Sequence, residues 1–105
     1  MYFIVIGIDG NDSEALNRRL ASRDGHLAKV KDGVEQGVQI IGVPLMDDNK
    51  SMNGSVMLYD FPTRDDLDNW LKDEPYIENN VWQDVEILNC DIPPMFKDMI
   101  RKDKS

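Results

Sequence analysis

The chain has 105 residues, 41% of them hydrophobic and 30% charged, which is the balance of one globular domain. Its formal charge of −8 disfavours nucleic acid and anionic membranes as partners, because both require a basic protein surface. Cys90 is the only cysteine, so an intrachain disulfide and a cysteine-rich zinc site are excluded. The apolar run 2–8 is too short for a signal peptide or a membrane span, and we expect a cytoplasmic protein.

The N-terminal part of the chain predicts a strand followed by a long helix. Residues 2–8 are β-branched and aromatic, as is typical of a strand. Residues 11–13 offer helix-capping side chains, and Gly33 or Gly37 is expected to end the helix. Between these limits apolar residues recur at helical spacing and form one stripe: Leu16, Leu20, Leu27, Val30 and Val34. We expect this stripe to face the core.

The middle of the chain predicts two strands joined by a loop. Residues 38–43 form the second predicted strand, which Pro44 stops, and residues 55–61 form the third. The polar stretch 47–53 between them is expected to be a hairpin loop.

A second helix and a fourth strand complete the predicted pattern. Thr63 is the expected N-cap of the helix, and Pro75 interrupts it. Three apolar side chains share one face of this helix: Leu67, Trp70 and Leu71. Apolar and acidic residues alternate over 81–88, as in a strand with one wetter face.

The order β-α-β-β-α-β predicts an α+β domain of the ferredoxin-like kind. We expect a four-stranded antiparallel sheet with both helices on one face, formed by residues 1–90. Residues 91–105 are a C-terminal extension, in which the apolar spacing over 95–100 predicts a short helix.

The predicted sheet has an apolar surface that the helices do not cover. The strands 2–8 and 55–61 carry hydrophobic residues on both faces, which implies that both faces of the sheet are buried. A second copy of the chain, packed face to face around a two-fold axis, would supply the missing cover. We therefore expect a homodimer that closes into an α/β barrel.

The only histidine, His26, lies on the predicted first helix, with Arg23 one turn and Arg19 two turns before it. Arg23 falls inside the apolar stripe, so we expect its guanidinium to be at least half buried and paired with a carboxylate. An imidazole held by a carboxylate can transfer protons near neutral pH. The alternative is a structural histidine. The candidate carboxylates lie at the ends of predicted elements: Asp9, Asp73 and Glu74.

Other site chemistries have little support in these residues. A single histidine without a cysteine cluster does not form a typical metal site, and no glycine-rich phosphate loop is present. Cys90 has no second histidine to activate it as a nucleophile. We expect no metal and no cofactor.

The run 19–27 (RLASRDGHL) resembles the helix signature of the YciI-like (YCII-related) family, and YFIV over 2–5 with Asp9 is similar to its first strand. The resemblance covers about residues 1–90. It implies a dimeric α/β barrel with a small-molecule cleft, in which His26 is the acid/base and Asp9 a carboxylate at the rim. It also implies a set of substrate-binding positions: Arg19, Arg23, Pro44, Ser55 and Tyr76. The chain has Val43-Pro44 where the family usually has Gly-Pro, and Glu74-Pro75-Tyr76 where it usually has Asp-Pro-Tyr.

The resemblance implies an acid/base enzyme, because some relatives remove hydrogen chloride from small chlorinated rings. The expected reaction class is elimination, including dehydrochlorination, or isomerisation of a small cyclic or lactone-like substrate. Two alternatives stay open: a non-catalytic binding domain on the same barrel, and a cofactor-free monooxygenase of the same superfamily.

Overall fold

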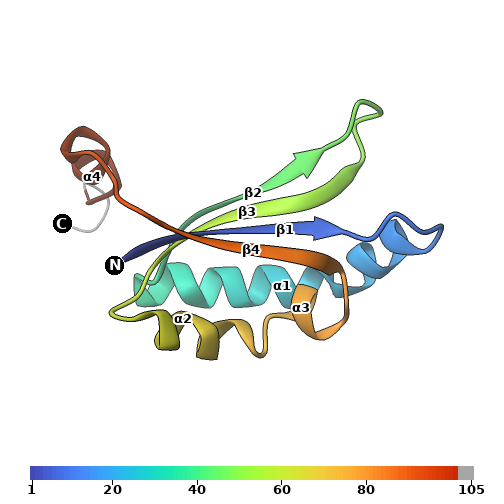
Figure 1. Cartoon of the computed structure of the whole chain (residues 1–105), viewed down its shortest axis with the longest axis horizontal. Coiled ribbons are helices and arrows are strands. Elements are labelled where there is room, and N and C mark those ends of the chain that lie inside the picture. The colour runs from blue at the N-terminus through green and yellow to red at the C-terminus, as the bar shows by residue number, and fades with distance from the viewer. Residues whose placement is uncertain (102–105) are drawn as a thin grey trace.

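The computed structural model describes residues 1–101 of the chain (Figure 1). Its elements follow in this order: β1 (Tyr2–Asp9), α1 (Ala15–Gln36), β2 (Gln39–Met46), β3 (Met52–Asp60), α2 (Arg64–Leu71), α3 (Pro75–Glu78), β4 (Trp82–Cys90) and α4 (Pro94–Arg101). The four strands form one antiparallel sheet in the order β2-β3-β1-β4. The predicted ferredoxin-like fold is therefore confirmed, with α3 as a short helix that the sequence pattern did not reveal.

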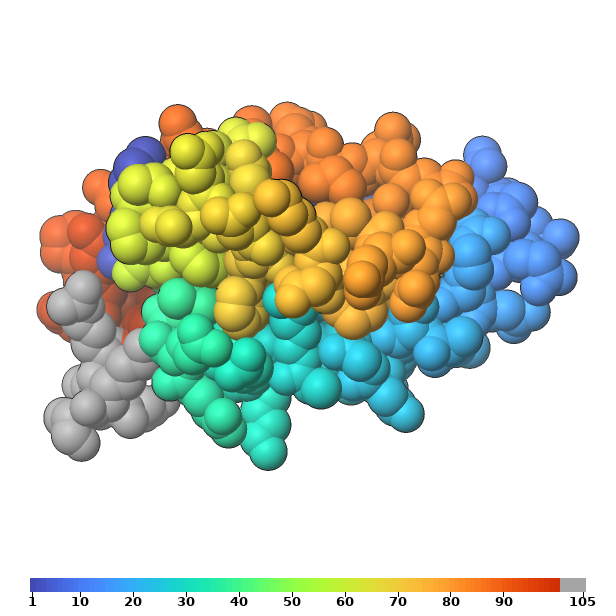
Figure 2. All heavy atoms as spheres, turned by 90° about the horizontal axis from the view of Figure 1, so that it is seen from below, coloured from blue at the N-terminus to red at the C-terminus, as the bar shows by residue number. Residues whose placement is uncertain are grey.

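The helices α1, α2 and α3 cover one face of the sheet (Figure 1). Seen from that side in Figure 2, α2 and α3 in yellow to orange lie alongside α1 in cyan. Hydrophobic side chains fill the space between these helices and the two central strands. The buried core consists of Phe3, Val5, Met57, Tyr59, Phe61, Leu67, Leu71, Tyr76, Val81 and Trp82.

Strand β2 runs through Pro44 and ends at Met46, whereas the sequence analysis expected Pro44 to stop it. A proline lacks a backbone N–H but can occupy an edge strand, where one side needs no ladder bonds. Since β2 pairs only with β3, it is such an edge. The β2–β3 hairpin curves away from α1 at this end of the sheet, as Figure 1 shows.

The first helix ends where a glycine allows it. Gly37 adopts a left-handed conformation with φ 79°, and its N–H donates to the carbonyl oxygen of Val34 at 3.1 Å. The N–H of Val38 donates to the carbonyl oxygen of Gly33 at 2.9 Å, which completes a Schellman motif. Of the two predicted ends, Gly37 is therefore the correct one.

The apolar stripe of α1 does not face the core, which corrects the expectation from the sequence. Leu16, Leu20, Leu27 and Val34 are each 40–50% exposed. The buried positions of α1 are polar or small instead: Arg19, Ser22, His26 and Gly33. Close approach explains this, because a Cβ at Gly33 would lie only 3.1 Å from the Gln39 Cβ and the Trp70 ring.

The face of the sheet opposite the helices is apolar as predicted. Ile4 pairs with Leu58 on β3 and Leu88 on β4, so these side chains share that face. On the outer strand, Ile41 and Val43 are exposed. Dimerisation through this face stays a prediction.

The C-terminal extension contains α4, at the end of β4 and away from the other helices (Figure 1). Three of its hydrophobic side chains are exposed: Met95, Phe96 and Met99. We predict from the sequence that this helix docks on the barrel or on a partner subunit; against residues 1–101, these three side chains stay at least half exposed. Within residues 1–101, every helix is too short or too polar to cross a lipid bilayer.

Candidate active site between α1 and the sheet

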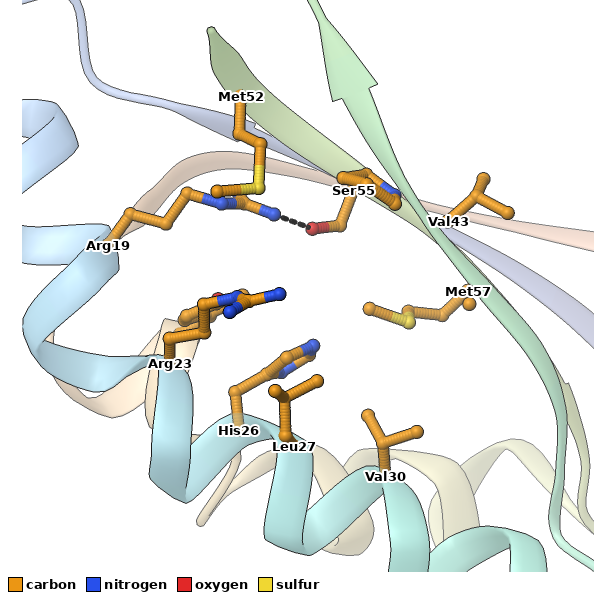
Figure 3. A pocket seen from close by; sticks show the side chains of 12 residues that line it. Arg19, Arg23, His26, Leu27, Val30, Val43, Met52, Ser55 and Met57 are labelled. Carbon is orange, nitrogen blue, oxygen red and sulfur yellow. Dashed lines mark hydrogen bonds between the residues drawn. The ribbon is translucent and has the colours of Figure 1, made fainter.

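A pocket of about 100 Å³ lies between α1 and the diverging β2–β3 hairpin (Figure 3). Its residues come from four elements: Arg19, Arg23, His26, Leu27 and Val30 from α1; Gly42, Val43 and Pro44 from β2; Met52, Ser55 and Met57 from β3; and Tyr76 from α3. Apolar walls with a few convergent polar groups are typical of a small-molecule site.

His26 and Glu74 form the central contact of the pocket. His26 is 5% exposed, Glu74 is 1% exposed, and the Nδ1 of His26 lies 2.6 Å from the Oε1 of Glu74. With Nδ1 engaged, the other ring nitrogen, Nε2, is the one available to a ligand, and Figure 3 shows a ring nitrogen of His26 directed into the pocket. A carboxylate on one nitrogen sets the tautomer and stabilises the imidazolium when the other takes up a proton.

The local sequence explains why Glu74 reaches His26. Glu74 is the N-cap of α3, and its Oε1 accepts a hydrogen bond of 3.0 Å from the backbone N–H of Tyr76. Pro75 at the first position of the helix has a φ suited to this start. The capping bond and the histidine thus share one carboxylate oxygen, which holds the side chain inward.

Aromatic rings fix the plane of the imidazole. Tyr76 stacks on His26 with ring centroids 3.9 Å apart and an angle of 11°, and Trp82 meets the imidazole edge-on at 6.0 Å. Gly7 on β1 makes room for the indole, since a Cβ there would lie 2.2 Å from the Trp82 ring. Gly7 therefore serves the packing of Trp82 against the sheet.

Arg19 and Asp9 form a second buried pair beside the first. The Nη1 of Arg19 donates to both carboxylate oxygens of Asp9, at 3.0 and 3.1 Å, and Nη2 donates to the hydroxyl of Ser55 at 2.8 Å. The guanidinium also lies 4.7 Å from the centroid of the Tyr76 ring. Burial raises the pKa of Asp9, and the positive charge of Arg19 opposes that rise. Asp9 therefore binds Arg19 and not His26.

The prediction for Arg23 is wrong. Its side chain is exposed, and among residues 1–101 it makes no ion pair or hydrogen bond. Figure 3 shows its guanidinium pointing into the pocket. Arg19, one turn earlier, has the buried and paired role instead, because α1 turns its polar face and not its apolar stripe toward the sheet.

Asp73 lies outside the site, although it precedes Glu74 directly. It is exposed and accepts a hydrogen bond of 2.6 Å from the Nζ of Lys29. This hydrogen bond, together with the positive charge of Lys29, lowers the pKa of Asp73. Of the three candidate carboxylates, only Glu74 therefore contacts His26. Within the described residues, no three His, Cys, Asp or Glu side chains are grouped as a metal site requires.

Sequence reasoning missed several pocket residues that have no polar signature. Met57 and Met52 on β3, and Leu27 and Val30 on α1, form its apolar walls. The pairing of Gly42 with Met57 and of Pro44 with Ser55 brings the two strands together at the pocket. Which residues of β2 and β3 meet at the pocket depends on the strand register, and the register cannot be read directly from a single sequence.

Solved structures place the chain in a class of α+β ferredoxin-like proteins. One is 5-chloro-2-hydroxyhydroquinone dehydrochlorinase TftG from Burkholderia phenoliruptrix AC1100, in complex with 2,5-dihydroxybenzoquinone (TM-score 0.77, 18% identity, 90% of this chain and 98% of that one). Another is an antibiotic biosynthesis monooxygenase (TM-score 0.53, 18% identity, 90% and 100%). A third is a dimeric ferredoxin-like protein from Jannaschia sp. CCS1 (TM-score 0.50, 7% identity, 87% and 98%). At these identities the likeness concerns the fold.

The family itself follows from the sequence. The YCII-related domain matches residues 1–91, and the chain belongs to this family. The resemblance seen in the helix run 19–27 is thereby confirmed. No curated protein matches the chain.

Proposed function

We propose that this protein is an enzyme that moves a proton on a small cyclic substrate, with His26 as the general acid/base. The supporting observation is the 2.6 Å contact between His26 Nδ1 and Glu74 Oε1, at a pocket into which the imidazole points. A base oriented by a buried carboxylate and facing an apolar pocket is the arrangement that proton transfer requires. Membership of a family whose fold is shared by a dehydrochlorinase supports the same reaction class.

Elimination is the reaction that this arrangement serves most directly. On a ring in which an sp3 C–H lies beside an sp3 carbon that carries chlorine, His26 Nε2 takes that proton, the electron pair of the C–H bond forms a C=C bond, and chloride leaves from the adjacent carbon. Glu74 stabilises the imidazolium that results. In an isomerisation the same imidazolium returns its proton to a different carbon, so both reactions need the same two residues.

The test is chloride release from small chlorinated lactones and cyclic ketones that carry an sp3 C–H beside the C–Cl carbon, together with a spectroscopic assay for double-bond shifts. With a substrate in hand, His26→Asn is expected to lower turnover by roughly 10²–10⁴-fold, the usual contribution of such a base. Glu74→Gln is expected to lower turnover less, because the imidazole remains while its orienting charge is lost.

Asp73→Asn is the matched control, because it removes the neighbouring carboxylate, which lies outside the pocket. Turnover should stay at the wild-type level. An unchanged rate in folded His26→Asn would contradict the proposal. Binding of the compounds without any turnover in the wild-type protein would favour the alternative of a non-catalytic binding domain.

A further inference from the structure

The pocket contains one positive charge, that of Arg23, for which residues 1–101 provide no counterion. Arg19 is paired with Asp9, and His26 is paired with Glu74. Arg23 lines the same pocket and, within the part of the chain that the structure describes, has no counterion. This stands out in a chain with 20 acidic and 12 basic residues.

In the free protein Arg23 makes no ion pair with residues 1–101 that would stabilise the fold, but its guanidinium is placed to bind a ligand in the pocket. An exposed guanidinium is hydrated, so the folded protein tolerates it without a partner. When a ligand enters the pocket and displaces water, the attraction between this guanidinium and a negative group becomes stronger, because the local dielectric falls. The net charge of −8 opposes anions at long range, but salt screens that repulsion beyond about 8 Å.

The planar shape of the Arg23 guanidinium indicates which class of anion it would bind. A guanidinium presents parallel N–H donors in one plane and binds planar oxyanions, carboxylates above all, through two hydrogen bonds. The apolar walls formed by Leu27, Val30 and Met57 suit a hydrophobic ring. A pocket of about 100 Å³ leaves room for no more than one ring, since a closed cavity that holds benzene has about 150 Å³.

We propose that the substrate of this site is a small cyclic monoanion, a ring carboxylate, whose carboxylate binds Arg23 while a ring C–H faces His26. This inference rests on the proposed function for the identity of the reacting group. The binding part of it can be tested without any turnover.

The experiment measures binding to the full-length protein by NMR titration with three ring probes. Benzoate carries a carboxylate, 4-nitrophenolate carries a single anionic oxygen, and benzamide is the neutral analogue of benzoate. Benzoate is expected to shift the signals of the His26 ring and to bind at least about tenfold more tightly than benzamide, which corresponds to one charge-assisted contact. Tighter binding of 4-nitrophenolate than of benzoate would replace the carboxylate with a phenolate and overturn that part of the proposal.

Three variants test the assignment to Arg23. Arg23→Met is expected to abolish the preference for benzoate over benzamide, and Arg23→Lys to retain part of it, since the charge stays and the second hydrogen bond is lost. Arg64→Met makes the same substitution at an exposed arginine of α2 and should leave benzoate affinity unchanged. Because Arg23 is exposed and unpaired, its variants should fold, which circular dichroism checks.

The outcomes separate this inference from the proposed function. Equal affinity for benzoate and benzamide, no benzoate binding at about 10 mM, or wild-type affinity in Arg23→Met would each overturn the anion site. His26→Asn should still bind benzoate, because the carboxylate contacts Arg23. If Arg23-dependent binding holds while no chlorinated ring is turned over, the anion site stands and the acid/base proposal fails.

Discussion

The two long faces of α1 reverse the usual distribution of polar and apolar residues. The face toward the sheet buries Arg19, Ser22 and His26, while the face toward solvent exposes Leu16 and Leu20. A surface helix ordinarily turns its apolar stripe to the core. Here the buried charges are tolerated because each has a partner within 3.1 Å, Asp9 for the arginine and Glu74 for the histidine.

A functional site can displace the hydrophobic face of a helix from the core. The pocket between α1 and β2–β3 needs polar groups where a core would place leucines, and the displaced leucines then lie on the surface. Large exposed apolar patches on a soluble protein mark interaction surfaces. Within residues 1–101, exposed apolar side chains lie on the α1 stripe, on the open face of the sheet and on α4.

The largest expected effect on stability comes from removing the buried ion pair between Arg19 and Asp9. Arg19→Met should lower the free energy of unfolding by ~3–5 kcal/mol, because it leaves Asp9 buried without its counterion. Arg23→Met, one turn away at an exposed side chain without a counterion among residues 1–101, should change it by less than about 0.5 kcal/mol. Urea unfolding followed by circular dichroism measures both. Similar losses in the two variants would show that the faces of α1 are not distinct.

A second prediction decides which apolar surface is covered in solution. Light scattering at micromolar concentration should give about twice the 12.0 kDa mass of one chain, because the open sheet face needs a partner. Leu58→Asp, which places a charge on that face beside Ile4, should convert the dimer into a monomer. Leu20→Asp, on the α1 stripe, is the control and should leave the dimer intact.

If Leu20→Asp gave a monomer and Leu58→Asp stayed a dimer, the interface would lie on α1 and not on the sheet. A monomeric wild-type protein at every accessible concentration would contradict the dimer altogether.

The smallest expected effect is a pH dependence at Asp9. Burial raises its folded-state pKa above 3.8, so the folded state binds this proton more tightly than the unfolded chain does. The contribution of Asp9 to stability is therefore fully present below pH 3.8 and decreases as the pH rises through the folded-state pKa. Arg19→Met removes the opposing charge and should raise the pKa of Asp9 further.

The measurement is an NMR titration of the Asp9 carboxyl, with unfolding at several values between about pH 3 and pH 7. Asp9→Asn should lack this component of the pH dependence. A folded-state midpoint for Asp9 below 3.8 would show that Arg19 outweighs burial.

Much of the fold was predictable because its signals are local. Thr63 accepts a hydrogen bond from the N–H of Asp66 at 3.1 Å, as expected of an N-cap, and Gly37 ends α1 through a left-handed turn. Such signals act over a few residues and need no tertiary contact. The continuation of β2 through Pro44 was missed because it depends on β2 being an edge strand, which is a property of the whole sheet.

The candidate site was predictable in its residue types but not in its pairs. His26 was identified as the single imidazole on a helix, and three carboxylates were equally available to it by sequence. Asp73 and Glu74 are neighbours in the chain, yet one binds Lys29 at the surface and the other is directed inward as the N-cap of α3. The choice between them is made by the start of a four-residue helix that has no periodicity of its own.

By itself, the sequence determined the order of the elements, the family and the histidine, because capping residues, strand alternation and a local motif are written in neighbouring positions. Only the tertiary structure decided which face of α1 is buried, which carboxylate holds His26 and which arginine is left facing the pocket. The physical reason is that a buried charge is stable only beside its partner, and these partners lie 10 and 48 residues away along the chain.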